Sequence, residues 1–522
     1  MNVQAIDGLG ETRRAEPRHG ESRHGEPWAG HMLTLILGVL AVRILVNALA
    51  LAPLHFDEAQ YWTYGEEPAF GYYSKPPLAA WLIRFSTELF GDTELGVRAL
   101  APVLHGWIAW LIFATGRRLF EARSGFWAGA VYLAMPGVTV SSGLMTTDPA
   151  MMAAWGAALY ALVRALQAEV SADPAERGGR LIWWGALGAA VGLGLLAKYT
   201  MVAFLGGCLG YVLFSRQGRW GARRTDYSGP AVAAFAAVLA LSPNLYWNAM
   251  NDFATIAHVG DNAKLGGGPK LDIVHAIEFL GAQAAIFGPV MLVALALMLV
   301  RGGWRDEWEF RLLMWLTLPL PLLMTVQAFL SRAHPNWAAP AYIAGALVVA
   351  TWLLDRRMRG WVIASLAVGA LAFVGFWGLA GVYAKQRTEL PRLYDPFKKM
   401  RIGPAICEKA LAARTGALAE ARLLSSDRRL LADCMFAGKL GTDDIAIFNG
   451  DGRAGNHYEL TSSLAAGEEG PFLLVLRMDQ TRAARFTGLF RQVVPIETGE
   501  IRTHADRVTP FFLAQVSGFN GY

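Results

Sequence analysis

Long apolar runs recur through the first three quarters of the chain, and they limit the folds it can adopt. Each run is about 17 to 25 residues long, the length a helix needs to cross about 30 Å of hydrocarbon. The chain has 522 residues, 54% of them hydrophobic and 17% charged, a balance too apolar for a water-soluble fold of this size. We expect an α-helical polytopic membrane protein with about eleven, and up to thirteen, transmembrane helices, near 32–52, 98–115, 124–142, 148–166, 182–197, 199–215, 230–248, 274–299, 310–330, 336–354 and 360–384.

Arginine residues are concentrated in every second loop between these runs. Lys and Arg are retained on the cytoplasmic side of a membrane, so the alternation gives an orientation. It predicts a cytoplasmic N-terminus and, with an odd number of spans, a C-terminus outside. The arginines are Arg117, Arg118, Arg123, Arg177, Arg180, Arg216, Arg219, Arg223, Arg224, Arg301, Arg305, Arg356, Arg357 and Arg359.

The two ends of the chain differ from this membrane region, expected at 31–385. Residues 1–30 are polar, with RHGE occurring twice, and we interpret them as a disordered cytoplasmic tail in which His19 and His24 are solvated and bind no metal. From 386 to 522 the composition is that of a soluble α/β domain. We expect strands at 423–427, 445–449, 472–477 and 509–516, and helices at 399–416 and 428–439.

Two of the three cysteines, Cys407 and Cys434, lie in this outer domain. An oxidising periplasm would allow them to pair. Sequence does not show whether they face each other, so a disulfide and two free thiols both stay open.

The loop 53–97 carries unusual polar chemistry beside a spanning helix, in the stretch HFDEAQYWTYGEEPAFGYYSKPP. The acidic pair Asp57 and Glu58 can supply a general base, with Asp57 the better candidate; the alternative is that Asp57 caps the next helix. Lys75, held by two prolines at a helix entrance, suits a phosphate. Its alternative is an interaction with a lipid headgroup.

Other loops on the same side hold further ionisable groups, which are costly at membrane depth and therefore indicate a shared polar cavity. Lys198 interrupts GLGLLAKYTMVAF and is expected to face this cavity. Asp148 begins a segment, either as a site carboxylate or as an N-cap. For substrate binding we assign Arg98, Tyr61, Tyr73, Trp247, Asn248, His258 and Asn336, each of which could instead be an interface anchor.

Two further patterns carry no site. Gly266-Gly267-Gly268 is followed by no P-loop pattern, and we interpret it as a flexible loop. No basic tract with interleaved aromatic residues indicates a nucleic-acid partner.

The ordered set HFDEAQYW, YYSKPPL, FGDTELGVRAL and TTDPAMM resembles the polyprenyl-phosphate-sugar glycosyltransferases related to protein O-mannosyltransferases and to the lipid A aminoarabinose transferase. The likeness covers most of 32–340. SPNLYWNAMNDFATIAH and SRAHPNWAAPAY look most like the bacterial branch that includes lipopolysaccharide galacturonosyltransferases.

The resemblance implies the C-type glycosyltransferase architecture in a bacterial inner membrane, with a periplasmic active site. It places Asp57 on the essential first-loop aspartate, Lys75 on the Lys-Pro-Pro lysine and Asp148 on the second acidic motif. Lys198 and Arg332 would be cations beside the donor phosphate. Aminoarabinose transferases have a glutamate that contributes to a metal site where this chain has Ser74, so we assign no metal and no certain cofactor.

We therefore expect an inverting enzyme that moves one sugar from a polyprenyl-phosphate carrier to lipopolysaccharide core or lipid A. The leading candidate for the sugar is galacturonic acid. The protein would also contact membrane lipids. Transfer to a protein or another surface glycan stays open. A lipid-linked sugar flippase is the alternative of another class. It would place polar residues on both membrane faces, often in repeated halves, whereas the polar motifs here gather on one face.

Overall fold

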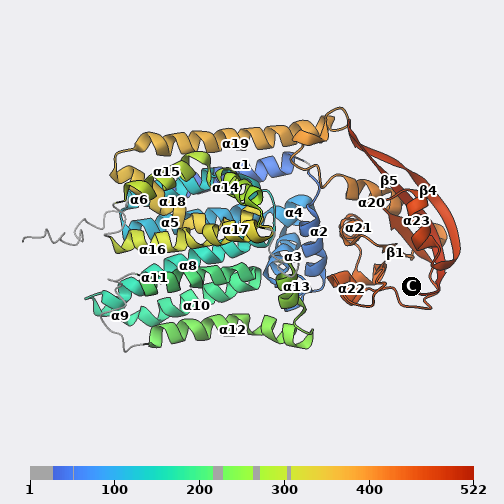
Figure 1. Ribbon diagram of the computed structural model, residues 1–522, viewed down its shortest axis with the longest axis horizontal. Helices are drawn as coiled ribbons and strands as arrows, with labels where there is room; N and C mark the ends of the chain where they lie inside the picture. The colour runs from blue at the N-terminus through green and yellow to red at the C-terminus, as the bar shows by residue number, and fades with distance from the viewer. Residues whose placement is uncertain (1–26, 51, 215–226, 263–270, 303–306) are drawn as a thin grey trace, which may run out of the picture.

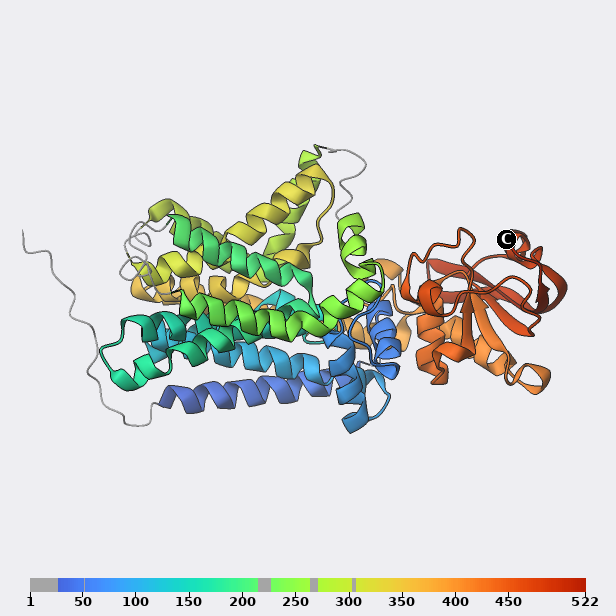
Figure 2. The same ribbon diagram turned by 90° about the horizontal axis from the view of Figure 1, so that it is seen from below.

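The computed structural model describes residues 27–50, 52–214, 227–262, 271–302 and 307–522. A bundle of long helices occupies one end of the molecule and an α/β domain the other (Figures 1 and 2). Arg216, Arg219, Arg223, Arg224, Arg305, the triple glycine and most of the N-terminal tail lie outside the described residues. The first helix begins at Pro27, earlier than the expected end of the tail at residue 30, as suits a proline in the first turn of a helix.

Seven described helices, or eight if a bent pair counts as one span, are long and apolar enough to cross a membrane. The seven are α1 (Pro27–Leu49), α4 with α5 (Glu94–Arg98, Leu100–Leu119), α8 (Thr147–Val170), α10 (Arg180–Ala197), α12 (Ser228–Met250), α16 with α17 (Trp308–Thr317, Pro319–Leu330) and α19 (Arg359–Gln386). Two shorter apolar helices, α11 (Val202–Phe214) and α18 (Ala341–Asp355), fill the bundle. The protein is a multi-pass helical membrane protein, and the count of about eleven stays a prediction.

Two of the expected spans are broken in the structure. The run 124–142 divides at Pro136 into α6 (Ala122–Ala134) and α7 (Pro136–Ser141). The run 274–299 bends by 112° between α14 (Ile273–Phe287) and α15 (Pro289–Arg301). In both cases a proline removes a helical hydrogen bond and begins a new helix, and Gly288 takes the φ of 95° that the sharp bend needs.

The first loop folds into helices at the end of the bundle that faces the α/β domain (Figure 1). They are α2 (Phe56–Glu66), α3 (Leu78–Phe90) and the short α4. Helix α2 is almost wholly buried, including Trp62 and Tyr64. A stretch that sequence marks as polar is therefore an internal part of the protein.

The C-terminal domain is built on a five-stranded sheet in the order β2-β1-β3-β5-β4. Strands β2 (Ile445–Ile447), β1 (Arg422–Ser425) and β3 (Phe472–Leu476) are parallel, whereas β5 (Arg507–Phe519) and β4 (Phe490–His504) are antiparallel. Helices α20 (Ile402–Ala413), α21 (Arg428–Gly438), α22 (His457–Thr461) and α23 (Gln480–Thr487) connect and cover them. Sequence misses β4, an edge strand with Pro495 beside an irregular register, because such a strand lacks clean alternation.

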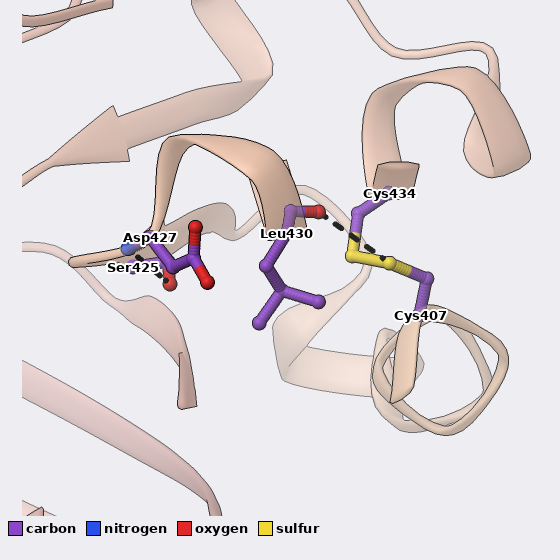
Figure 3. Close-up of a disulfide and its surroundings, with 5 residues drawn as sticks. All are labelled: Cys407, Ser425, Asp427, Leu430 and Cys434. Carbon is purple, nitrogen blue, oxygen red and sulfur yellow. Dashed lines mark hydrogen bonds between the residues drawn. A yellow bond between two sulfur atoms is a disulfide. The ribbon is translucent and has the colours of Figure 1, made fainter. Parts of the chain in front are cut away.

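Cys407 and Cys434 form a disulfide that joins α20 to α21 (Figure 3). Both cysteines are buried, and the Cys407 sulfur lies 3.6 Å from the carbonyl oxygen of Leu430. The bond fixes two helices that contribute residues to the cavity described below. The question that sequence left open is thus answered in favour of pairing.

One hydrophobic core runs without a break from the first loop into the C-terminal domain. It includes Trp62 and Tyr64 on α2 together with Cys407, Leu423 and Leu473 of that domain. Across the contact, the hydroxyl groups of Thr63 and Tyr458 are 2.7 Å apart, and the rings of Trp62 and Phe436 meet edge to face. The C-terminal domain and α2 therefore share one continuous hydrophobic core.

Candidate active site

A cavity of about 1680 Å³ lies where the bundle, the first loop and the C-terminal domain meet. Its bundle side is apolar, with Val138, Val202, Leu320 and Leu323 among the lining residues. The rest of its lining includes the charged residues Asp57, Lys75, Asp148, Lys198 and Arg332 that sequence selected. A cavity with an apolar wall and a few convergent polar groups is the usual form of a ligand site.

Asp57 lines this cavity in the first turn of α2. The N-cap of the helix is His55, whose Nδ1 accepts a hydrogen bond from the Asp57 backbone at 3.3 Å, so the alternative that Asp57 is the N-cap is wrong. The Asp57 carboxylate is 30% exposed and lies 3.6 Å from His55 Nδ1. It therefore projects into the cavity with room for a substrate hydroxyl.

Glu58 points the other way and does not line the cavity. Its carboxylate is fully buried and accepts hydrogen bonds from the backbone N–H groups of His55 (2.8 Å) and Met145 (2.9 Å). It also forms an ion pair with Arg98 at 2.8 Å. Arg98 in turn donates to the carbonyl oxygens of Ala52 and Pro53. Both residues were expected to touch substrate, but the structure places them behind α2, where they hold its N-terminus.

Asp148 and Lys198 meet in the cavity. The N-cap of α8 is Thr146, so Asp148 is not the N-cap. The Lys198 ammonium lies 2.6 Å from Asp148 Oδ1, and Asn336 donates to Asp148 Oδ2 at 2.6 Å. Three residues from three distant parts of the chain thus form one cluster, in which the carboxylate fixes the lysine and the amide.

Lys75 and Tyr61 line the same cavity. Burial lowers the pKa of the Lys75 ammonium below its ordinary value, and the Asp57 carboxylate opposes this shift. Burial raises the pKa of Tyr61 well above its ordinary value, and the charges of Asp57 and Asp148 add to the increase. Tyr61 therefore remains a neutral hydroxyl, whereas the carboxylates of Asp57 and Asp148 favour the charged form of Lys75 against the effect of burial.

Arg332 and His258 also belong to the cavity wall. The ring of Tyr73 packs edge to face on His258, with centroids 5.6 Å apart. Tyr73 is not among the lining residues, so it supports His258 from behind.

Trp247 and Asn248 lie outside the cavity wall. Asn248 is buried and donates to the Tyr199 hydroxyl at 3.2 Å. Trp247 packs so closely on Gly71 that a Cβ there would lie 2.5 Å from its ring. Trp247 thus packs α12 against the first loop, and Asn248 links α12 to Tyr199, structural tasks that their residue types did not reveal.

The residues present do not fit a metal site of the kind that the family resemblance raised. Ser74 is buried at the cavity wall in place of a carboxylate. Among the described residues, no three His, Cys, Asp or Glu side chains are grouped so that they could hold a metal ion.

Sequence reasoning missed the contribution of the C-terminal domain to this cavity. Arg428 and Arg429 follow β1, and Arg477 follows β3. Because β1 and β3 are parallel neighbours, their carboxyl ends lie at one edge of the sheet. The available signal was the position of these arginines, directly after the predicted strand 423–427 and at the end of the predicted strand 472–477.

Three comparisons bear on this geometry. The sequence profile described as dolichyl-phosphate-mannose-protein mannosyltransferase matches residues 74–247. The lipid A galacturonosyltransferase RgtD of Rhizobium johnstonii is 30% identical over 452 residues, which cover 85% of this chain and 90% of that protein. An undecaprenyl phosphate-aminoarabinose arabinosyl transferase of Pseudomonas aeruginosa is 27% identical over 61% of this chain and 58% of its own length.

The fold is similar to that of solved ArnT structures from Cupriavidus metallidurans. The apo structure aligns with a TM-score of 0.64 at 15% identity, covering 93% of this chain and 98% of that one. The structure with bound undecaprenyl phosphate aligns with a TM-score of 0.63 at 16% identity. The chain belongs to the polyprenyl-phosphate-sugar-dependent membrane glycosyltransferases, in the branch that contains the lipopolysaccharide galacturonosyltransferases.

Proposed function

We propose that this enzyme transfers galacturonic acid from a polyprenyl-phosphate carrier to lipid A, at the periplasmic face of a bacterial inner membrane. One observation carries the proposal. A single cavity combines an apolar wall with two carboxylates and three cations of the bundle and first loop, in a chain that aligns with 90% of a lipid A galacturonosyltransferase. The apolar wall suits a polyprenyl chain, and the cations suit its phosphate.

The proposed reaction is a direct displacement at the anomeric carbon. The Asp57 carboxylate takes the proton of the acceptor hydroxyl as the hydroxyl oxygen bonds to the sugar. The bond from the anomeric carbon to the phosphate oxygen breaks, and its electron pair leaves with the polyprenyl phosphate. Lys75, Lys198 and Arg332 stabilise the charge that develops on that phosphate. Inversion follows from attack on the face opposite the leaving group.

Asp148 has a supporting role in this scheme. Its carboxylate is occupied by Lys198 and Asn336, at 2.6 Å each, so it is poorly placed to accept a proton from a substrate. It positions the lysine ammonium for the phosphate. Glu58 and Arg98 act similarly on α2, because they fix the turn from which Asp57 projects.

The charge of the cavity favours a uronic acid over an amino sugar as the transferred group. The bundle and first-loop side contributes Lys75, Lys198 and Arg332 against Asp57 and Asp148. Ser74 keeps a further carboxylate out of the wall, where it would repel the carboxylate of galacturonic acid. An amino sugar would be repelled by the same cations.

The periplasmic location of the site is supported by the arginine pattern. Arg118, Arg123, Arg177 and Arg356 lie at the ends of α5, α6, α9 (Pro174–Gly178) and α18. These ends lie opposite the C-terminal domain in the bundle (Figure 1). Since arginine-rich loops stay in the cytoplasm, the cavity and the C-terminal domain would be outside.

The test is transfer by the purified full-length protein in nanodiscs, with lipid A as acceptor and polyprenyl-phosphate galacturonic acid as donor. Mass spectrometry of the lipid A identifies the added sugar. Transfer of galacturonic acid is expected, and Asp57→Asn should lower kcat by about 10² to 10⁴-fold, the contribution of a general base. Transfer of aminoarabinose but not galacturonic acid would refute the proposed sugar, and a fully active Asp57→Asn variant would refute the base.

A further inference from the structure

The C-terminal domain contributes a strongly cationic wall to the cavity. Eight of its lining side chains are Lys or Arg, and Asp433 is the one acidic side chain among the described residues of the domain that line the cavity. Burial raises the pKa of Asp433 to about 8, helped by the charge of Asp427, so most of this carboxyl is neutral at pH 7. The eight cations are Arg392, Lys398, Lys399, Arg428, Arg429, Arg477, Arg482 and Arg507.

Four of these cations, Arg428, Arg429, Arg477 and Arg482, are brought together by the topology of the sheet, and we call them the sheet-edge arginines. Two stand at the start of α21, directly after β1, and the others follow β3 through the start of α23. Strands β1 and β3 pair in parallel, with Leu424 opposite Leu474. Their carboxyl ends therefore meet at one edge, the place where open α/β sheets bind ligands.

A side recess of about 460 Å³ opens at this edge. Arg428, Arg429, Arg477 and Met478 line both the recess and the main cavity, so the two spaces are adjacent. Asp427 also lines the recess, but it is already engaged by Arg477 at 3.3 Å and by the Arg429 backbone N–H at 2.9 Å. The recess is thus built with more positive than negative charge.

Two of the sheet-edge arginines, Arg428 and Arg429, lie near the residues around the proposed base. The guanidinium of Arg429 lies 4.4 Å from the ring centroid of Phe56, the residue before Asp57. The charge of Arg428 is among those that lower the pKa of Lys75, after burial. An acceptor whose reacting hydroxyl lies at Asp57 would therefore place its other polar groups near these arginines.

These contacts favour the acceptor, and not the donor, as the ligand of the sheet-edge arginines. The donor has one phosphate and, as proposed above, a sugar carboxylate, for which Lys75, Lys198 and Arg332 are available beside the apolar wall. The sheet-edge arginines belong to the domain beyond the ends of the helices (Figure 2), where the headgroup of an acceptor lipid would stand. Arginine forks suit phosphates and carboxylates equally well.

We propose that the sheet-edge arginines form an acceptor-recognition site for a phosphate or carboxylate group on the headgroup of an anionic saccharide lipid. This inference rests on the proposed function and goes beyond it. The site holds the acceptor by a group that does not react, so that its hydroxyl is presented to Asp57. Binding energy from a remote group is a general way to orient a reacting one.

The experiment measures lipid binding to the purified full-length protein in nanodiscs by native mass spectrometry. The probes are lipid A with both phosphates, lipid A without phosphates, dephosphorylated lipid A carrying acidic core sugars, and polyprenyl phosphate. The variant is Arg477→Gln with Arg482→Gln. The matched control is Arg491→Gln, an exposed arginine of the same domain paired with Glu469 outside the cavity lining.

The double variant should bind the anionic lipid A at least about tenfold more weakly, since charge-assisted hydrogen bonds are lost. Binding of polyprenyl phosphate and of neutral lipid A should match the control. Weaker binding of the bisphosphate alone identifies a phosphate site, and weaker binding of the acidic-sugar form identifies a carboxylate site. Equal binding of both anionic probes by double variant and control would overturn the inference.

Two further measurements keep the result interpretable. If the glutamine variant does not fold, Arg477→Lys with Arg482→Lys and the salt dependence of wild-type binding replace it, and affinity for anionic lipid A that does not fall with salt would overturn the inference. Transfer is assayed separately. A wild type that binds anionic lipid A through these arginines but transfers no galacturonic acid would contradict the proposed function alone, whereas transfer with unchanged binding in the variant would contradict this inference alone.

Discussion

Replacing Glu58 by Gln should destabilise the protein strongly, and the structure gives the reason. The Glu58 carboxylate accepts five hydrogen bonds from four donors: one each from His55 N, Met145 N and Arg98 Nη2, and two from Arg98 Nε, which contacts both oxygens at 2.9 and 3.3 Å. Both oxygens face donors only, so the NH₂ group of a glutamine would meet another donor whichever way it turned. Arg98, 3% exposed, would keep its charge without a partner.

The expected cost is about 3 to 5 kcal/mol, the usual effect of breaking a buried ion pair. The matched control is Glu66→Gln, which breaks an ion pair with Arg84 whose side chains are 29% and 36% exposed; such pairs contribute about 0 to 1 kcal/mol. Thermal unfolding of the purified full-length protein, followed by intrinsic fluorescence, compares the two. Glu58→Gln should unfold several degrees below Glu66→Gln.

The double variant Glu58→Gln with Arg98→Met distinguishes a structural role of Glu58 from a role in the transfer reaction. Removing both charges of a buried pair is less costly than removing one, although the glutamine amide still faces the N–H group of His55 or Met145. Stability and transfer should therefore recover in part, and together, if Glu58 only positions α2. A double variant that regains the unfolding temperature but transfers no sugar would show that Glu58 takes part in the reaction. An unfolding temperature for Glu58→Gln equal to that of the Glu66→Gln control would refute the energetic reasoning.

Two other changes test the C-terminal domain. The pKa of Asp433 is raised in the folded protein to about 8, so the folded state binds more protons than the unfolded state between about pH 4 and pH 8, and stability falls as pH rises through that window. Asp433→Asn should remove this slope and stabilise the protein at pH 8 by at most about 5 kcal/mol; an unchanged dependence of unfolding temperature on pH would contradict it. Cys434→Ser opens a disulfide across 27 residues and should cost about 3 to 4 kcal/mol by the loop-entropy estimate, measured against wild type unfolded with and without reductant.

Much of the fold could be predicted because its determinants are local. Apolar length indicated the bundle, and alternating short patterns indicated four of the five strands of the C-terminal domain. The misses have physical causes. Pro136 and Gly288 break helices within runs that are apolar throughout, so hydropathy alone shows no interruption. Strand β4 stays hidden because an edge strand needs no continuous apolar face.

The site was partly predictable for a different reason. Charged residues at membrane depth must face a cavity or a partner, and Asp57, Lys75, Asp148 and Lys198 do line one cavity. The same rule cannot say which member of an acidic pair faces inward. Glu58 follows Asp57 directly, yet one step along a helix turned it toward Arg98. Nor could sequence show that Trp247 packs on Gly71 outside the cavity lining, since an aromatic ring suits both a sugar and a glycine.

The helix that carries the proposed base is held from both sides, and this ties acceptor recognition to chemistry. On the bundle side, Glu58 and Arg98 fix the N-terminus of α2. On the other side, Trp62, Thr63 and Tyr64 are buried in the core shared with the C-terminal domain. Without that domain, the most apolar face of α2 would be exposed to water at about 25 cal/mol for each Å² of apolar surface. The domain that we propose to bind the acceptor therefore also keeps Asp57 in position, so binding and proton removal depend on one shared packing surface.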